Sequence, residues 1–491
     1  MVSRAILNGW PLVPPSRRKS APVNLAAPSI SGTFAVGQTL TLSDGTWDGF
    51  PTIAFSRQWL RDGVPIAGAT GSTYLLVDAD ANRIISATVT ASSSIGSASK
   101  DAVGALAQGG GAAKTAGIAG NRFMLPTGSQ AYTAPYTSRR VHFAPAVAKV
   151  TNLKCVEIDW YIQVNGSVAG SARSLRKYIE YPAGVFHPVL WSGIAQLDLP
   201  GTITKAVSDI VISSVTGLPL EIAPAAAYYE RTVNLTNIAN MPNMILPAAS
   251  NVLGVSDGNT ASDAGNTGTI NPTTGTRTFG SVVVFGDIMA ADARSVVAPG
   301  DSLLWSQGDV TGVGANQSSG WWERMMSAAG IPTLKLAMPG ITTGGFIAAL
   351  SAIADLLSVV PFSEADNELG LNDLTTGASV ATILANYQTI YGLFSGKPIT
   401  QNTITTRTDT SNAYADAAGQ TVKTDGNMAG LNTLNDAIRA GLAHVTRVRD
   451  VADADMTARN SGIHAGPFPP VLDGTHFTSP KAADLASKLA A

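Results

Sequence analysis

The sequence is poor in cysteine, in long apolar runs and in charge of one sign, and each shortage excludes a class of protein. Its single cysteine, Cys155, excludes an internal disulfide framework. No window holds the roughly 18 uncharged apolar residues that a helix needs to cross a bilayer, so no membrane partner is predicted. Lys and Arg number 32 against 34 Asp and Glu, without a long run of either sign. This balance predicts no nucleic-acid partner.

The sequence also lacks the patterns that hold metals and cofactors. No cluster of histidine and cysteine has the spacing of transition-metal ligands. No glycine-rich loop has the form that binds phosphates. Neither a metal nor a cofactor is therefore expected.

The N-terminus lacks the uninterrupted apolar core of a signal peptide. Its short apolar patches are broken by Asn8, Gly9 and Pro11, and three basic residues follow at 17–19. If the protein acts outside a cell, we expect it to leave by a route other than this N-terminus.

What the sequence has in abundance is Gly, Ser, Thr and Ala, whereas charged residues make up only 13% of its 491 residues. That composition is typical of β-rich modules with many turns, and the length predicts two to four domains. We predict an extended arm over 1–21, a small β-sandwich over 22–104 and a Gly-rich linker over 105–114. A larger, jelly-roll-like β-sandwich over 115–285, which could bind carbohydrate, and an α/β domain over 290–491 complete the predicted organisation.

The first sandwich is predicted from short β-prone runs at 37–42, 58–63 and 85–91, each bounded by turn residues. Several short sequence motifs in this region resemble those of bacterial and phage immunoglobulin-like modules. They are Gly-Thr-Trp at 45–47, Gln-Trp at 58–59 before Arg-Asp-Gly at 61–63, Ile-Ala-Gly-Ala-Thr at 66–70 with Tyr74, and Val-Thr-Ala at 89–91. The resemblance implies that Trp59 is the core tryptophan and packs without a disulfide.

The second sandwich is predicted from longer β-prone runs, which lie at 156–164, 174–181, 208–215 and 228–235. Cys155 precedes the first of these runs and is predicted to be a small core residue. The stretch 256–278, rich in Asn, Gly and Thr, is predicted to be a long surface loop.

From about residue 290 the pattern changes, because short apolar runs now alternate with helical segments. Helices are predicted at 320–330, 346–360, 379–395 and 429–443. This alternation predicts a parallel sheet with helices on both faces. In such sheets, reactive groups gather at the carboxyl ends of the strands.

Two short motifs about 170 residues apart carry the chemistry. Gly-Asp-Ser-Leu at 300–303 follows the apolar run 295–298, which is typical of a buried strand. Asp473 lies three residues before His476, so one turn can present both side chains. A serine hydroxyl needs an imidazole to take its proton, and the imidazole needs a carboxylate to fix its tautomer. The pattern predicts a serine esterase with Ser302 as nucleophile, His476 as base and Asp473 as acid.

Two further blocks lie between these motifs, Ala-Met-Pro-Gly-Ile-Thr-Thr at 337–343 and Glu-Leu-Gly-Leu-Asn-Asp at 368–373. With four blocks in this order, residues 294–491 resemble the SGNH hydrolases, also called the GDSL esterase/lipase family. The resemblance implies a flavodoxin-like α/β fold with a parallel sheet. It also implies an oxyanion hole formed by the backbone N–H groups of Ser302 and Gly340 and by the side-chain amide of Asn372, three donors that can stabilise a tetrahedral intermediate.

Each of these assignments has a structural alternative. Ser302 could instead cap the helix that follows it, and Asn372 with Asp373 could form an ordinary helix cap. Two features depart from the family pattern. Pro299 stands where a strand usually donates a hydrogen bond, and the stretch 363–368 is polar although a buried parallel strand should be apolar.

The aromatic residues after the nucleophile and the remaining histidines complete the candidates. Trp305 and Trp321 are predicted to contact the substrate, with the helix core as the alternative; Trp322 is assigned to the core. His444 is assigned to a helical run. His464 is assigned to a loop, because no carboxylate lies at a supporting spacing. The last two histidines, His142 and His187, are assigned structural roles in the second sandwich.

The first functional hypothesis is an ester hydrolase that works through an acyl-serine intermediate. We expect it to remove short acyl groups, such as acetyl, from a polysaccharide, because sandwich modules often hold glycans. The alternative is a structural or receptor-binding phage protein, such as part of a tail fibre, whose hydrolase domain only binds glycan. The predicted arm, the immunoglobulin-like module and the missing signal peptide fit a virion component.

The predicted partners are an acylated polysaccharide, other virion proteins bound through the arm and the first sandwich, and a second copy of the chain in a homo-oligomer. The predicted location is a virion or an extracellular site reached without a signal peptide, with the cytoplasm as the alternative.

Overall fold

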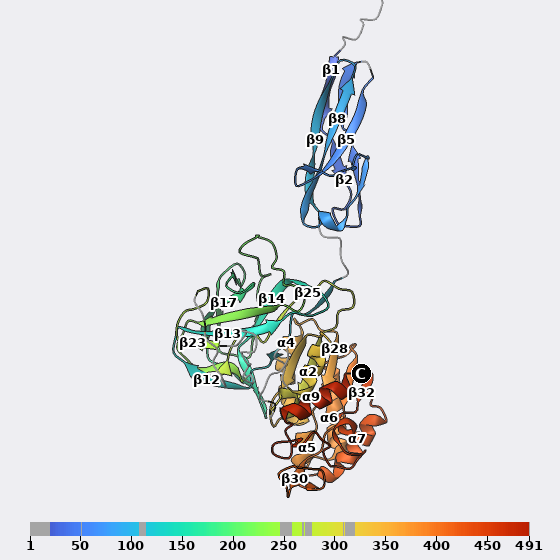
Figure 1. Cartoon of the computed structure of the whole chain (residues 1–491). Coiled ribbons are helices and arrows are strands. Elements are labelled where there is room, and N and C mark those ends of the chain that lie inside the picture. Colours follow the sequence, from blue (N-terminus) through green and yellow to red (C-terminus); the bar gives the residue numbers. More distant parts are fainter. Residues whose placement is uncertain are drawn as a thin grey trace, which may run out of the picture. The chain divides into compact units, whose positions relative to one another are not determined.

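The computed structural model describes residues 20–50, 52–107, 114–245, 258–267, 270, 277–307, 309 and 320–490. The chain divides into two compact units, Met1–Ala113 and Lys114–Ala491, whose ribbons are shown in Figure 1. The predicted arm at 1–21 lies outside the described residues except for its last two. The predicted linker at 105–114 is described only at its two ends, and its first three residues belong to a strand.

All strand pairs of the described residues in the first unit are antiparallel. They form a four-stranded sheet in the order β6-β5-β8-β9, a three-stranded sheet β2-β3-β7 and the pair β1-β4. The strands are β1 Ser20–Ala26, β2 Ser29–Ser31, β3 Thr39–Ser43, β4 Thr46–Phe50, β5 Ala54–Arg61, β6 Val64–Pro65, β7 Thr73–Leu75, β8 Arg83–Ser93 and β9 Gly96–Ala107. In β8 every second residue from Ile85 to Ala91 is buried, as expected for a strand that packs one face on a core.

Trp59 is the centre of this core. Its side chain is fully buried and stacks on Tyr74, with ring centroids 5.5 Å apart. The indole N–H donates to the carbonyl of Gly71 at 2.9 Å, which satisfies the polar edge of the ring. The predicted core role of Trp59 is confirmed, whereas the likeness to immunoglobulin modules stays a prediction.

The second unit begins with a region of antiparallel sheets. Their strand orders are β10-β25-β14-β20, β18-β17-β21-β13-β23 with β19 beside β17, β12-β22-β24 and β15-β16. The strands are β10 Thr115–Ile118, β12 Gly128–Tyr132, β13 Tyr136–Phe143, β14 Val150–Ile158, β15 Trp160–Gln163, β16 Gly166–Ala169, β17 Arg173–Glu180, β18 Phe186–Pro188, β19 Gln196–Leu199, β20 Lys205–Val207, β21 Ala227–Asn234, β22 Ile238–Ile245, β23 Gly258–Thr260, β24 Arg277–Thr278 and β25 Val283–Ile288. Cys155 is buried within β14, as predicted.

Two predictions for this region are wrong. The run 208–215 is not a strand: it contains only an isolated bridge between Ile212 and Pro219, in an irregular segment whose backbone bonds to the edge of β14. The loop predicted at 256–278 contains β23, whose backbone pairs with β13 and forms the edge strand of the sheet β18-β17-β21-β13-β23. Other parts of the predicted loop lie outside the described residues.

The rest of the chain forms the predicted α/β arrangement. Among the described residues, six parallel strands lie in the order β11-β27-β26-β28-β29-β32. They are β11 Phe123–Met124, β26 Val296–Gly300, β27 Thr333–Ala337, β28 Glu364–Asn367, β29 Ile399–Asn402 and β32 Arg447–Arg449, and a separate hairpin joins β30 Thr408–Thr410 to β31 Gln420–Val422. The last five strands of the sheet, numbered along the chain, have the spatial order 2-1-3-4-5 of flavodoxin-like sheets. The predicted fold class is confirmed as antiparallel β-sheets followed by a parallel α/β sheet.

The outermost strand of this sheet, β11, comes from the antiparallel region, about 210 residues before its neighbour β27. Phe123 of β11 pairs with Leu334 of β27. A single hydrophobic core also includes residues of both regions, such as Val156 and Leu336. The antiparallel region and the α/β part therefore fold as one unit.

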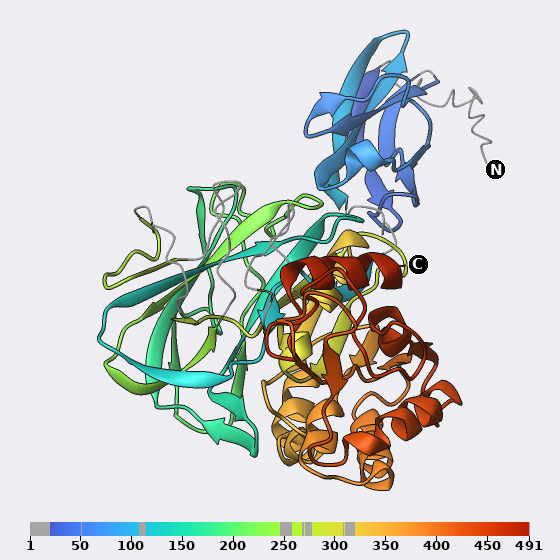
Figure 2. The ribbon, with the colours of Figure 1, turned by 60° about the horizontal axis from the view of Figure 1, so that its bottom comes forward.

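The helices fall into two groups that pack separately. Helix α2 packs against α9, whereas α3 packs against α6, and Figure 2 shows α9 in front of the sheet. The helices are α1 Ser302–Trp305, α2 Trp321–Ala328, α3 Thr343–Ala348, α4 Leu350–Leu357, α5 Leu371–Thr375, α6 Val380–Gly392, α7 Leu431–Arg439, α8 Val451–Asp455 and α9 Ser479–Leu489. All four predicted helices are present with shifted ends, and the one predicted at 346–360 is interrupted between α3 and α4.

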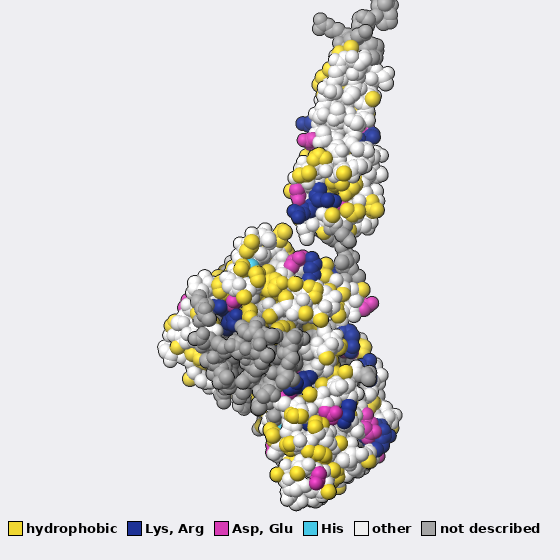
Figure 3. All heavy atoms as spheres, in the orientation of Figure 1, with side chains coloured by type: hydrophobic (Ala, Val, Ile, Leu, Met, Phe, Trp, Pro, Cys, Tyr) yellow, Lys and Arg dark blue, Asp and Glu magenta, His cyan; other side chains and the backbone are white. Residues whose placement is uncertain are grey.

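The described surface carries scattered charge. On the face drawn in Figure 3, basic and acidic side chains of the described residues lie interspersed rather than in fields of one sign. None of the helices in the described part of the chain has both the length and the apolar character that a membrane span requires.

Candidate active site

The candidate site lies where the direction of strand order reverses, between β26 and β28. Ser302 follows β26, and Asn372 follows β28, so both stand at the carboxyl end of the sheet. In open parallel sheets this crevice is the usual ligand-binding position, since no crossover covers it.

Ser302 opens α1 directly after the central strand. The side chain of Asp301 caps this helix by accepting the N–H of Leu303 at 2.9 Å, so the helix cap is Asp301 and the alternative role proposed for Ser302 is wrong. Gly300 permits the tight turn, because a β-carbon there would lie 2.4 Å from the side chain of Leu304. Ser302 itself is 6% exposed.

The turn at residues 473–476 brings a carboxylate and an imidazole to this serine. His476 Nε2 lies 2.9 Å from Ser302 Oγ, and His476 Nδ1 lies 2.7 Å from Asp473 Oδ2. The other oxygen of Asp473 accepts the backbone N–H groups of Thr475 at 3.1 Å and His476 at 2.9 Å. The structure thus joins the three predicted side chains in one hydrogen-bonded series, while their catalytic roles remain predictions.

The environment of Asp473 favours its ionised form. Partial burial raises the pKa of this carboxyl, but hydrogen bonds from the backbone and ring of His476 outweigh that effect and lower the pKa below its ordinary value. Asp473 therefore stays negatively charged at neutral pH and can accept the Nδ1 proton of the imidazole. That bond makes Nε2 the proton acceptor facing Ser302.

A cavity of about 230 Å³ opens over the serine. It is lined by Ser302, Gln307, Gly340, Leu371, Asn372, Thr375, Arg407, Asp473, Thr475 and His476. Gly340 lies in the turn after β27 with φ +79°, a backbone conformation that residues other than glycine rarely adopt. The predicted oxyanion donors Ser302, Gly340 and Asn372 therefore border one cavity.

Asn372 is held by two acceptors. Its Nδ2 lies 3.1 Å from the carbonyl of Ile341 and 3.3 Å from Asp301 Oδ2. Asn372 is the second residue of α5, whose N-cap is Gly370, so the helix-cap alternative for Asn372 is wrong. Asp373 beside it ties α5 to α3 by accepting the N–H of Thr343 at 2.9 Å and its hydroxyl.

The polar strand β28 is accommodated because the carboxylate of Asp366 and the amide N–H of Asn367 are paired. Asp366 accepts the indole N–H of Trp322 at 2.8 Å and forms an ion pair with Arg449. The amide of Asn367 donates to Gln401 on β29 at 2.7 Å. Satisfied polar groups of this kind can stay inside a sheet without the usual cost of burial.

Pro299 is also compatible with its strand. Its carbonyl accepts the N–H of Glu368 at 3.0 Å, while the formal pairing of β26 with β28 stops at Val297. The missing N–H of Pro299 therefore lies beyond the residues that pair β26 with β28.

Arg407 is a cavity residue that sequence reasoning missed. It follows β29, and its Nε donates to Thr475 Oγ1 at 3.0 Å, in the turn that carries His476. Its Nη1 pairs with Asp425 at 2.6 Å. A single arginine in a threonine-rich stretch gave no signal, because only the tertiary fold brings it to the turn.

No protein-family model and no curated protein matches the sequence. Among solved structures, a member of the lipolytic G-D-S-L family from Veillonella parvula matches at 14% identity over 40% of this chain and 96% of its own, with a TM-score of 0.28. A GDSL-like lipase from Bacteroides thetaiotaomicron matches at 13% identity over 40% and 85%, also with a TM-score of 0.28. A Bacillus subtilis protein matches at 13% identity over 71% and 78%, with a TM-score of 0.29. At these values, none of the three assigns the chain to a family.

The two tryptophans predicted to contact the substrate lie elsewhere. Trp321 is 1% exposed and packs in the hydrophobic core through α2, so its predicted role is corrected to packing. Trp305 is half-buried against Met124. Neither ring is among the described residues that line the cavity. Trp322 is a core residue, as predicted.

Two histidine assignments in the α/β part are also corrected. His464 is fully buried, and its Nδ1 bonds to Asp455 Oδ2 at 2.9 Å. Asp455 lies nine residues earlier, at the end of α8. His464 therefore does have a carboxylate partner, which the spacing of residues near it in the sequence does not indicate. His444 is not helical but lies in a turn with φ 71°, beyond the end of α7.

The two remaining histidines pack within the antiparallel region, as predicted. His142 lies fully buried beside Glu230, with His142 Nε2 3.4 Å from the carboxylate. His187 Nε2 contacts the carbonyl of Tyr181 at 2.6 Å.

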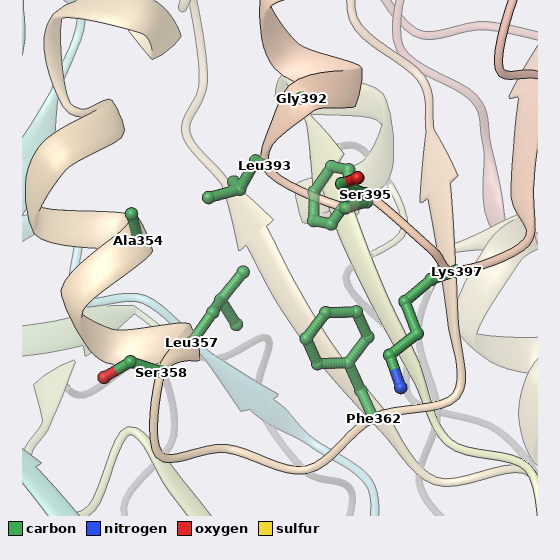
Figure 4. Close-up of a pocket in the computed structure, with 9 residues that line it drawn as sticks. Ala354, Leu357, Ser358, Phe362, Gly392, Leu393, Ser395 and Lys397 are labelled. Carbon is green, nitrogen blue, oxygen red and sulfur yellow. The ribbon is translucent and has the colours of Figure 1, made fainter.

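A second hollow of about 370 Å³ lies at the opposite end of the sheet. It is bordered by the ends of α4 and α6 and by the segments that lead into β28 and β29, including Phe362 and Lys397 (Figure 4). Because it faces the amino ends of the strands, it is separate from Ser302. No group of three or more His, Cys, Asp and Glu among the residues described here could hold a metal ion.

Proposed function

We propose that this chain is a serine ester hydrolase of the SGNH type. The observation that carries the proposal is the hydrogen-bonded series from Asp473 through His476 to Ser302 at the edge of a cavity. The four ordered motifs of the sequence support the same family. An imidazole between a carboxylate and a serine hydroxyl is the arrangement that activates serine in acyl transfer.

In the proposed reaction, Ser302 Oγ attacks the ester carbonyl carbon while His476 Nε2 takes its proton. Asp473 holds the Nδ1 proton and stabilises the positive charge that develops on the ring. The negative charge on the former carbonyl oxygen is stabilised by the N–H groups of Ser302 and Gly340 and by the amide of Asn372. His476 then gives its proton to the leaving alcohol, and a water molecule that loses its proton to the same ring releases the acid from the serine.

The proposed substrate is a short acyl ester, such as an acetyl ester, on a polysaccharide. The small cavity and its lining support this choice. Among the described lining residues Leu371 is the single large apolar side chain, whereas Gln307, Thr375 and Arg407 offer hydrogen-bond donors of the kind that a sugar hydroxyl or an ester oxygen accepts.

We further propose that the first unit attaches or positions the enzyme in a virion, where it would contact other particle proteins. The support is that Met1–Ala113 forms a compact unit of its own. The competing proposal is a phage receptor-binding protein in which the cavity only holds glycan. The retained nucleophile geometry favours the enzyme, because glycan binding alone requires no imidazole within 2.9 Å of a serine.

The test is hydrolysis of p-nitrophenyl esters by the wild type, Ser302→Ala and the control Ser358→Ala. Ser358 bonds only locally, to the carbonyl of Asp355, and lies at the opposite end of the sheet. We expect turnover of the acetate ester by the wild type and Ser358→Ala, weaker turnover of the octanoate ester, and loss of both with Ser302→Ala. Equal rates for the wild type and Ser302→Ala would refute the proposed function.

Acetate release from acetylated polysaccharides would then test the proposed substrate. A protein that hydrolyses the small esters but releases no acetate from any acetylated polysaccharide would contradict the substrate and leave the ester hydrolase intact.

A further inference from the structure

Two buried carboxyl groups contact each other directly beneath the candidate nucleophile. Asp301 is fully buried and Glu368 is 6% exposed. Glu368 Oε2 accepts the backbone N–H of Asp301 at 3.1 Å, which places the two carboxyl groups side by side. A hydrogen bond between two carboxyl groups requires a proton on one of them.

The contacts of Asp301 indicate which residue carries this proton. Asp301 Oδ1 accepts the N–H of Leu303, and Asp301 Oδ2 accepts the amide of Asn372. Both oxygens of Asp301 therefore already act as acceptors, which suits the ionised form. Glu368 is then the donor in the pair.

The surroundings make a second negative charge costly. Asp373 on α5, Asp366 on β28 and the hydroxyl of Tyr387 on α6 face the pair, and His476 lies beyond Ser302. Asp366 is balanced by Arg449, but no described basic side chain forms an ion pair with Asp301 or Glu368.

The pKa values of both carboxyl groups are raised, as expected for two buried acids that share one proton. Burial raises the pKa of Glu368 well above its ordinary value, and the negative charge of Asp301 raises it further. Burial also raises the pKa of Asp301, to about 7, although the N–H of Leu303 and the Glu368 hydrogen bond oppose the rise.

We propose that Glu368 and Asp301 hold one proton between them, carried by Glu368, and that the pair positions the Asn372 amide for the oxyanion. This inference rests on the proposed ester hydrolase. The amide has two N–H groups, and Ile341 takes one of them at 3.1 Å. The other is shared between Asp301, at 3.3 Å, and an oxyanion in the cavity that Asn372 lines.

The proton on Glu368 matters for two reasons. It partly neutralises Asp301, so that this carboxylate orients the amide without competing strongly for its hydrogen. It also keeps a second buried negative charge away from the developing oxyanion, where repulsion would be strong in a site of low dielectric constant. Glu368 and Asp301 are thus positioning residues that act through Asn372.

The test compares Glu368→Gln, Glu368→Ala and the control Glu364→Gln. The glutamine amide can donate to Asp301 as the protonated acid does, whereas alanine cannot. Glu364 begins the same strand but pairs with Arg294, at the far end of β28. On p-nitrophenyl acetate we expect Glu368→Gln and Glu364→Gln to keep kcat within about threefold of the wild type. Glu368→Ala should lower kcat by about tenfold or more with KM little changed, part of the effect of losing an oxyanion donor.

Infrared spectroscopy gives a readout that needs no turnover. The carbonyl stretch of a protonated carboxylic acid should be present in the wild type at pH 7, retained in Glu364→Gln and Ser302→Ala, and lost in Glu368→Gln. A wild-type spectrum without such a band overturns the inference even if a variant fails to fold. A folded Glu368→Gln protein that is as slow as Glu368→Ala also overturns it.

The two proposals fail differently. Equal ester hydrolysis by the wild type and Ser302→Ala refutes the proposed function and with it the role toward the oxyanion. The infrared band then still decides whether Glu368 carries a proton. If Ser302→Ala loses activity, but the infrared bands or the kcat values of the Glu368 variants differ from the results expected here, only the shared proton of Glu368 and Asp301 is refuted.

Discussion

Replacement of Asn372 by alanine should impair the chemical step much more than it impairs folding. The amide is one of three proposed donors to the oxyanion, and removal of one such donor costs about 3 kcal/mol of transition-state stabilisation. At about 1.36 kcal/mol per factor of ten, kcat should fall about 150-fold. KM should change little, because the charged oxygen exists only in the transition state and the intermediate.

The cost to stability can be worked out from the same contacts. The substitution removes two hydrogen bonds, to Ile341 at 3.1 Å and to Asp301 at 3.3 Å. At about 1 kcal/mol each, the free energy of unfolding should fall by about 2 kcal/mol. Water in the adjacent cavity can reach the abandoned carbonyl of Ile341, which limits the loss.

The matched control is Asn427→Ala. Asn427 is also a half-buried amide of the α/β part, and its Nδ2 donates to the carbonyl of Ala378 at 2.9 Å, outside the cavity. The hydrogen bond to Ala378 predicts a loss of about 1 kcal/mol in the free energy of unfolding in urea, and the variant should keep its kcat. Steady-state kinetics on p-nitrophenyl acetate check both variants. If Asn372→Ala kept kcat within about threefold of the wild type while Ser302→Ala was inactive, Asn372 would not be an oxyanion donor.

Four further predictions concern the turn, the buried charges and the first unit. Asp473→Asn should lower kcat by about 10³–10⁴-fold, because an amide facing His476 Nδ1 favours the wrong tautomer; near-normal kcat in this variant would exclude Asp473 as the acid. Lys481→Met should lower the free energy of unfolding by about 3–5 kcal/mol, since Lys481 and His464 both compensate the buried carboxylate of Asp455; a loss below about 1 kcal/mol in urea would contradict that pairing. Burial raises the pKa of Asp455, but its bonds to His464 and Lys481 lower it overall, so the stability that Asp455 contributes should be present at neutral pH and lost as the pH falls through the depressed pKa; acid titration of folding in Lys481→Met against the wild type checks the sign. A protein of residues 114–491 should hydrolyse p-nitrophenyl acetate at the full-length rate, since Ser302 and its partners all lie in the second unit; a slower, folded protein would show that the first unit contributes to turnover.

Much of the site could be predicted because its chemistry is local. A strand ending in Gly-Asp-Ser, and an aspartate three residues before a histidine, each need only one turn to present their side chains. The sequence could not show that Asp301 caps α1, because Ser302 and Asp301 are both good capping residues. In the structure the side chain of Asp301 caps α1, and that of Ser302 lines the cavity instead.

The errors involve contacts between distant segments. Nothing near His464 in the sequence indicates Asp455 as its partner, since the two meet through the antiparallel bridge that the folded chain forms between Met456 and His464. The short distance along the chain from Ser302 predicts that Trp321 lines the pocket, whereas the packing of α2 turns its ring into the core. The polar stretch of β28 looked unsuitable for a buried strand, because its partners Arg449 and Gln401 come from two other strands.

The contribution of Phe123 and Met124 to the parallel sheet limits how this protein can be recombined. A fragment that began near residue 290 would leave β27 as an unpaired edge beside the uncovered residues of a shared core, a template for aggregation. Exchange of the ester-cleaving part between proteins, in the laboratory or in evolution, should therefore succeed only when the cut falls before residue 114. The part that can be exchanged as a whole is therefore the second unit, Lys114–Ala491.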